Sequence, residues 1–213
     1  TKDEQISLAQ AKNSFARGAY GETLEHLPDS SDPEVASMRA ISEFRLKRLP
    51  EAYRAAQKAL AGAHKGALAD DSLADLAEIL IAFNDKERDF IRMETDLGKV
   101  AGLLEKESER VTYALADAKW YQKKHAAAAA AYKEALEKFS AGERAERAKY
   151  NLGISLISLG KKEEAVKALT EVAASPTSVW AESAKQELEL IKWEQKYSGV
   201  LRTLPPSGLG INN

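Results

Sequence analysis

The sequence contains no cysteine and only six prolines among its 213 residues. Without cysteine the chain forms no disulfide, binds no metal through thiolates and has no thiol nucleophile. No apolar run approaches the 18 or more residues that a membrane-spanning helix needs, so no direct membrane span is expected. The net charge is only −2, with no basic domain and no basic–aromatic motif, which argues against nucleic acid as a partner.

Residues that carry enzyme chemistry are also sparse. The three histidines, His26, His64 and His125, are far apart and lack the i, i+4 spacing of a helical zinc pair. The segment from Gly208 to Gly210 is too short for a phosphate-binding loop, and no helical pattern follows it. The many carboxylates, with lysine and arginine at helical spacing, indicate solvated helix surfaces. We therefore expect no enzyme, no metal site and no cofactor.

No secretory signal pattern opens the chain. Because Thr1 is not a methionine, the sequence is also compatible with a targeting segment that was removed upstream of it. The absence of cysteine is compatible with either reducing or oxidising compartments. We expect a soluble protein of the bacterial cytoplasm or periplasm, and the sequence does not choose between them.

Helical signals dominate the chain. Charged residues make up 30% of it and alanine is abundant, as in long exposed helices. The pattern is clearest over residues 148–173, where Gly153 and Leu156 lie on one helical face, Gly160 ends the helix and Ala165 opens the apolar face of a second helix. Because Gly153 and Ala165 are small, two antiparallel helices can approach closely there.

The same order of large, small, turn and small positions recurs along the chain. Residues 112–139 repeat it well, with Ala116 and Ala128 in the small positions. The helical segment 72–104 keeps the apolar periodicity and has an expected turn at Asn84-Asp85, but it departs from the rest of the pattern. The weaker copies and this irregular hairpin occupy residues 8–27, 36–60 and 72–104.

This arrangement resembles the tetratricopeptide repeat, a helix–turn–helix unit of about 34 residues. The resemblance implies an all-α fold: a right-handed superhelix of antiparallel helical hairpins, closed by a C-terminal capping helix and followed by an extended tail. We assign residues 1–197 to the repeat domain and 198–213 to the Pro/Gly-containing tail. The expected hairpins are 4–28, 34–61, 72–104, 109–139 and 145–174, and the expected capping helix is 178–197.

In arrays of this type the first helices of successive hairpins line a concave face that contacts partner peptides, so the resemblance places the binding surface there. Aromatic side chains on such a face supply a large contact area at low entropic cost. For Phe44 and Trp120, packing between hairpins is the alternative interpretation. The expected partner-binding residues, which we call the first-helix stripe, are Phe44, Tyr113, Asp117, Trp120, Tyr121, Tyr150 and Ile154.

The tail is the second candidate region for binding. It contains Pro205-Pro206 and three glycines, and its prolines favour an extended form that docks at a lower entropy cost. The apolar anchors expected in a groove of this chain or of a neighbouring copy are Leu204, Leu209 and Ile211. In the second case the tail would form a homo-oligomer.

We predict a non-enzymatic protein–protein interaction scaffold that binds a partner peptide or protein through its concave face, in a bacterial multiprotein assembly. Two alternatives stay open. The first is a structural helical repeat protein that associates with itself, and the second is an accessory domain of a larger protein. The sequence names neither the partner nor the pathway.

Overall fold

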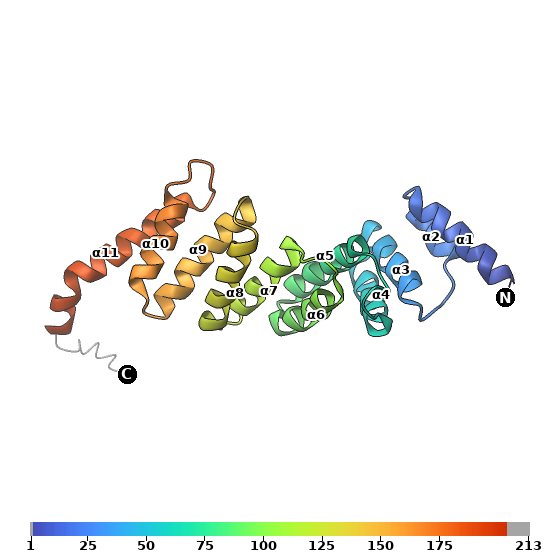
Figure 1. Cartoon of the computed structure of the whole chain (residues 1–213), viewed down its shortest axis with the longest axis horizontal. Helices are drawn as coiled ribbons and strands as arrows, with labels where there is room; N and C mark the ends of the chain where they lie inside the picture. The colour runs from blue at the N-terminus through green and yellow to red at the C-terminus, as the bar shows by residue number, and fades with distance from the viewer. Residues whose placement is uncertain (1, 204–213) are drawn as a thin grey trace, which may run out of the picture. The chain divides into compact units, whose positions relative to one another are not determined.

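The computed structural model describes residues 2–203, and within them all side chains except those of residues 3, 4 and 199–203. Over this range the chain forms eleven α-helices and no β-strand (Figure 1), which confirms the expected all-α class. The chain divides into two compact units, residues 1–131 and 132–213, with the boundary inside α8. The helices are α1 (Lys2–Ala16), α2 (Tyr20–His26), α3 (Pro33–Arg45), α4 (Leu49–Gly62), α5 (Asp70–Glu87), α6 (Phe90–Leu103), α7 (Glu109–Tyr121), α8 (His125–Lys138), α9 (Glu143–Ser158), α10 (Lys162–Ala173) and α11 (Ala181–Thr203).

The helices from α1 to α10 form hairpins whose turns share one backbone geometry. In each turn one residue has a positive φ, and its amide donates to the carbonyl three residues earlier. The next amide donates to the carbonyl five residues before it, which completes a Schellman motif. The positive-φ residues are Gly18, Lys47, Arg88, Lys123 and Gly160. The weak copies and the irregular hairpin therefore turn in the same way as the two clear repeats.

The turn of the third hairpin lies later than the sequence analysis placed it. Helix α5 continues through Asn84 and Asp85, and the left-handed residue is Arg88. Asn84 is fully buried, and its amide nitrogen donates to the Leu80 carbonyl at 2.9 Å and to Asp96 at 3.1 Å. The prediction of an Asn-Asp turn was wrong because the amide nitrogen of Asn84 donates inside the core instead of in a local turn.

The left-handed lysine in the α7–α8 turn leads to a stability prediction. A non-glycine residue in this conformation costs about 1 kcal/mol, which glycine avoids. Lys123→Gly should therefore raise the free energy of unfolding by about 0.5 kcal/mol, whereas Gly160→Ala in the equivalent turn should lower it by about 1 kcal/mol. Urea unfolding of both variants measures the difference. A Lys123→Gly variant less stable than the parent would contradict the turn geometry.

The first unit contains a buried polar cluster within its apolar core. Tyr53 in α4 donates its hydroxyl to Asp96 in α6 at 2.8 Å, and Gln57 donates to the Tyr53 oxygen at 2.9 Å. Asn84 in α5 donates to the same Asp96 oxygen at 3.1 Å. Burial, and then the hydrogen bond to Asp96, raise the pKa of Tyr53 to about 12. The cluster joins three helices, and Asp96 is only 3% exposed.

In the second unit, helices α9 and α10 approach closely at Gly153, as the sequence predicts. A Cβ atom placed on Gly153 would lie 2.6 Å from Cγ of Leu169. The three atoms nearest to that position all belong to Leu169, and Ala165, the small residue expected at this approach, is fully buried one helical turn before it. The missing side chain of the glycine thus makes room for a large residue of α10.

Helix α11 packs on the second unit through Ala184, Leu188 and Ile191. It begins at Ala181 and runs to Thr203, so the extended form expected for residues 198–203 was wrong. The first proline of the predicted tail is Pro205, and nothing before it removes a helical hydrogen bond. The expected tail anchors Leu204, Leu209 and Ile211 lie outside the described residues.

Candidate functional site

Part of the first-helix stripe is occupied by packing within the first unit. Tyr113 and Asp117 of α7 are 3% and 8% exposed, and Phe44 of α3 packs half-buried against the apolar core. Burial raises the pKa of the Tyr113 hydroxyl, and the nearby Glu109 carboxylate raises it further. These positions fit the alternative of packing between helices. Their role in partner binding stays a prediction.

Tyr121 of the same stripe is exposed, at the end of α7. Its ring stacks on Phe90 with centroids 4.3 Å apart and meets the half-buried Trp120 edge-on at 5.0 Å. The Arg88 guanidinium lies 4.9 Å from the Phe90 centroid, a cation–π contact. Phe90 and Arg88 were not predicted as site residues because they come from a different hairpin turn than Tyr121.

The two stripe residues of the second unit are half-buried. Tyr150 of α9 stacks on Trp180 with centroids 5.3 Å apart. Burial raises the pKa of the Tyr150 hydroxyl, and the Glu187 carboxylate adds to this effect. Ile154 lies one helical turn further along α9 and is also half-buried. The segment before α11 therefore covers part of this face of α9.

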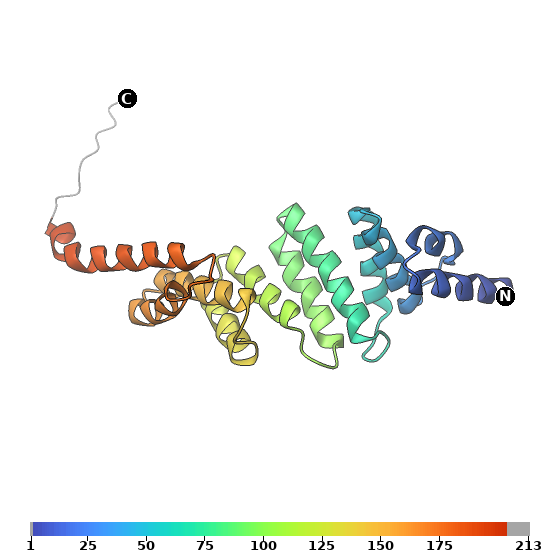
Figure 2. The same ribbon diagram turned by 90° about the horizontal axis from the view of Figure 1, so that it is seen from above.

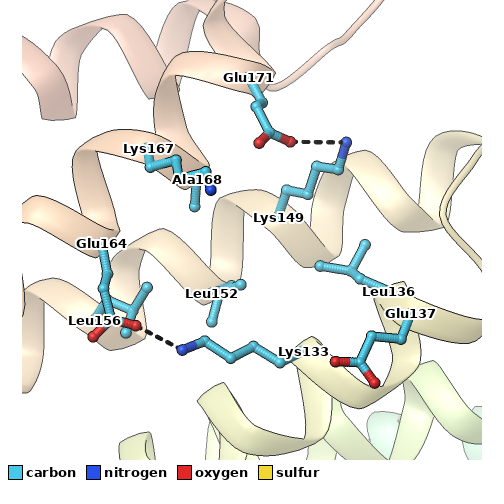
Figure 3. A pocket seen from close by; sticks show the side chains of 10 residues that line it. All are labelled: Lys133, Leu136, Glu137, Lys149, Leu152, Leu156, Glu164, Lys167, Ala168 and Glu171. Atoms are coloured by element: carbon cyan, nitrogen blue, oxygen red, sulfur yellow. Dashed lines mark hydrogen bonds and ion pairs between the residues drawn. The ribbon is translucent and has the colours of Figure 1, made fainter.

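The second unit has a groove of about 450 Å³ that the sequence analysis did not predict (Figure 3). It runs between α8 and α10, the second helices of two successive hairpins, and α9 contributes to its floor. We call it the second-helix groove. Its lining residues are Lys133, Leu136, Glu137, Lys149, Leu152, Leu156, Glu164, Lys167, Ala168 and Glu171.

The floor of the second-helix groove is apolar. Leu152 and Leu156 of α9 are 7% and 2% exposed, and Leu136 and Ala168 are half-buried beside them. Alanine at position 168 leaves space that a larger side chain on α10 would fill. The floor can therefore accept an apolar side chain from another polypeptide.

Charged side chains form the rim of the groove. Lys133 of α8 contacts Glu164 of α10 at 2.6 Å, and Lys149 of α9 contacts Glu171 of α10 at 3.2 Å (Figure 3). The hydrogen bond from Lys133, with the nearby Lys161, holds the pKa of Glu164 below its usual range. Both ion pairs are well exposed to water, so each contributes little to stability and opens readily to a partner.

Two rim residues make no such contact. Glu137 of α8 and Lys167 of α10 are exposed and form no ion pair with any residue in the range that the structure describes. They lie on different helices of the groove, so the rim offers one negative and one positive charge to a partner. In the sequence these two residues look like ordinary charges on a helix surface, and only the fold places them around one groove.

The described residues contain neither a metal-binding cluster nor a membrane-spanning helix. Between residues 2 and 203, no group of three or more histidine, cysteine or acidic side chains could hold a metal ion. Within the same range, no helix combines the length and the apolar character needed to cross a bilayer.

Comparison with known proteins identifies the repeat. Residues 113–179 match the family model of the tetratricopeptide repeat. This segment belongs to the tetratricopeptide repeat family. The match spans the two hairpins with the clearest pattern in the sequence, which confirms the expected resemblance, and it includes every lining residue of the second-helix groove.

Solved structures extend the likeness to most of the chain. A crystal structure of MamA protein covers 96% of this chain and 99% of its own, with a TM-score of 0.60 and 13% identity. An AMB-1 MamA structure covers 83% and 94%, with a TM-score of 0.63 and 15% identity. At these identities the likeness concerns the fold alone. No curated protein sequence matches the chain.

Proposed function

We propose that this chain is a non-catalytic interaction scaffold that binds a partner polypeptide in the second-helix groove. The observation that carries the proposal is an apolar floor enclosed by charged side chains from three helices. Water leaves such a floor when an apolar side chain enters. Full burial of one leucine or methionine contributes about 1.5–3 kcal/mol.

The rim charges favour one kind of partner. Glu137 and Lys167 stand on different helices without ion pairs among the described residues, so they complement a segment with a basic group near α8 and an acidic group near α10. Complementary charges of this kind contribute more to specificity and to association rate than to affinity. The proposed partner segment therefore combines an apolar anchor with charges of both signs beside it.

This site differs from the concave first-helix face that the sequence analysis favoured. We prefer the groove because Tyr113 and Asp117 of the first-helix stripe are already buried by the chain itself. The tetratricopeptide repeats over residues 113–179 support an interaction role in general. A bacterial multiprotein assembly is the setting we propose for it.

Peptides selected on the intact chain from a displayed library of short random sequences test the proposal. Ala168→Phe fills the floor of the groove, and Lys167→Glu reverses one rim charge. Each should weaken the selected peptides at least about tenfold, because a filled pocket or a like charge removes about 1.4 kcal/mol or more of binding. Fluorescence anisotropy measures the Kd.

Matched controls place the same substitutions elsewhere. Ala101→Phe and Lys99→Glu change exposed residues of α6 in the first unit, so they should leave peptide affinity unchanged. Circular dichroism checks that all four variants keep the parent helicity. Selected peptides that bind Ala168→Phe as tightly as the parent, but lose affinity for Tyr121→Ala, would move the site to the first-helix stripe.

A further inference from the structure

Helix α11 continues well beyond the part of the second unit that supports it. Among the side chains of α11 that the structure describes, the last buried one is Ile191, and those from Lys192 to Ser198 are exposed or half-exposed. Figure 2 shows the helix running on past α10. In this part Glu194 forms an exposed ion pair with Lys162 of α10 at 2.6 Å. A short helix without tertiary contacts is marginal in water, so this extension calls for a partner.

The side of α11 that faces away from α10 carries large apolar residues. Leu190 and Trp193 are 57% and 52% exposed, and the Tyr197 ring lies 5.2 Å from the Trp193 ring. These three residues follow the i, i+3, i+7 spacing of one helical face. We call them the outer stripe of α11. A tryptophan exposed to this extent beside a leucine and a tyrosine is an apolar patch typical of an interface.

The charges of α11 are distributed unevenly along the helix. Residues 181–191 contain three glutamates and one lysine, whereas residues 192–198 contain two lysines and one glutamate. The first part is therefore negative and the second part positive. A second copy of the same helix in the antiparallel direction places unlike halves against each other.

We propose that the outer stripe of α11 pairs antiparallel with α11 of a second copy of this chain. A two-fold axis between Leu190 and Trp193 brings Leu190 beside the partner's Trp193, and Trp193 beside the partner's Leu190. Such an interface is self-complementary, as in most homodimers. Because the α10 contacts use the opposite side of α11, both interfaces form together.

The flanking charges determine the direction of the pairing. Glu189 and Lys196 are one heptad apart and lie on the same edge of the outer stripe. Antiparallel pairing sets Glu189 against the partner's Lys196 twice, whereas parallel pairing sets Glu189 against the partner's Glu194, which lies on the other edge of the stripe. The present contacts of these residues, Glu189 with Lys192 at 2.7 Å and Lys196 over the Tyr197 ring, are exposed and weak enough to be exchanged.

Light scattering coupled to size-exclusion chromatography tests the proposal on the full chain between about 1 and about 200 μM, because self-association depends on concentration. The parent should shift from monomer to dimer, and Trp193→Glu should raise the dimer Kd at least about tenfold. Gln195→Glu adds the same charge to an exposed position off the stripe, so it should behave as the parent. A parent that stays monomeric, or a Trp193→Glu variant that dimerises like the parent, overturns the proposal.

A charge exchange tests the antiparallel direction. E189K and K196E should each weaken their own homodimers because like charges then face each other. An equimolar mixture of the two variants should restore the dimer, since every facing pair is again unlike. Failure of the mixture to restore it overturns antiparallel pairing. Peptide binding in the second-helix groove should be unchanged in all these variants, so the outcome is independent of the proposed function.

Discussion

Gly153→Leu should lower the free energy of unfolding by about 3 kcal/mol, because the new side chain must enter space that Leu169 already fills. Even a Cβ atom at this position would lie 2.6 Å from Cγ of Leu169, which is itself fully buried. Neither helix can yield without disturbing the contact between α9 and α10. Urea denaturation followed by circular dichroism measures the change.

A second glycine provides the control for this prediction. Gly98 lies within α6, and no atom surrounds the place of its Cβ within 4 Å. Gly98→Ala should stabilise the chain by up to about 1 kcal/mol through helix propensity, whereas Gly153→Ala should destabilise it. In a Leu169→Ala background the cost of Gly153→Ala should largely disappear, since the two residues are coupled. Equal effects of Gly98→Ala and Gly153→Ala would contradict the close approach.

Asp96→Ala should cost about 3 kcal/mol, because it leaves two buried donors without their acceptor. The Tyr53 hydroxyl and the Asn84 amide both donate to the same Asp96 oxygen, at 2.8 and 3.1 Å. Glu87→Ala removes an exposed acid from the last turn of α5 and should change stability by no more than about 0.5 kcal/mol. Thermal and urea unfolding of both variants compare the two costs. A small effect of Asp96→Ala would show that the polar cluster is dispensable.

The same cluster predicts a loss of stability at alkaline pH. The pKa of Tyr53 is raised from an ordinary value of 10 to about 12, so folding favours the neutral hydroxyl. This stabilisation is complete below pH 10 and is lost as the pH rises through 12, and its size is on the order of 2 kcal/mol. The stability difference between the parent and Tyr53→Phe should therefore shrink between about pH 10 and pH 12. A constant difference over this range would exclude Tyr53 as the group that titrates.

The periodic spacing of apolar residues was sufficient to predict the hairpins of the chain. Burial in a helix repeats with the helical turn, so positions such as Leu156 and Leu169 can be assigned to a core from local sequence alone. The turn after α9 could likewise be predicted from Gly160, because only glycine adopts a positive φ without strain. Lys47, Arg88 and Lys123 adopt the same conformation without this signal, so the position of their turns could not be read from a glycine.

The details of packing required the tertiary structure. The sequence indicated that Gly153 allows a close approach, but the side chain that uses the space is Leu169 because of the relative register of α9 and α10. The turn signal at Asn84 was overridden by a hydrogen bond to Asp96, which lies on the next helix. Contacts between helices depend on register and crossing geometry, and local sequence carries neither.

The candidate sites, too, depend partly on local sequence and partly on the tertiary structure. The sequence alone determined that this is a helical repeat chain, since amphipathic periodicity is a local property of each segment. Only the fold brought Lys133 and Glu164 of different helices to one groove, and only the fold buried Tyr113 while it left Trp193 exposed. Aromatic and charged residues look alike in core, groove and interface positions, because their role depends on which neighbouring helix covers them.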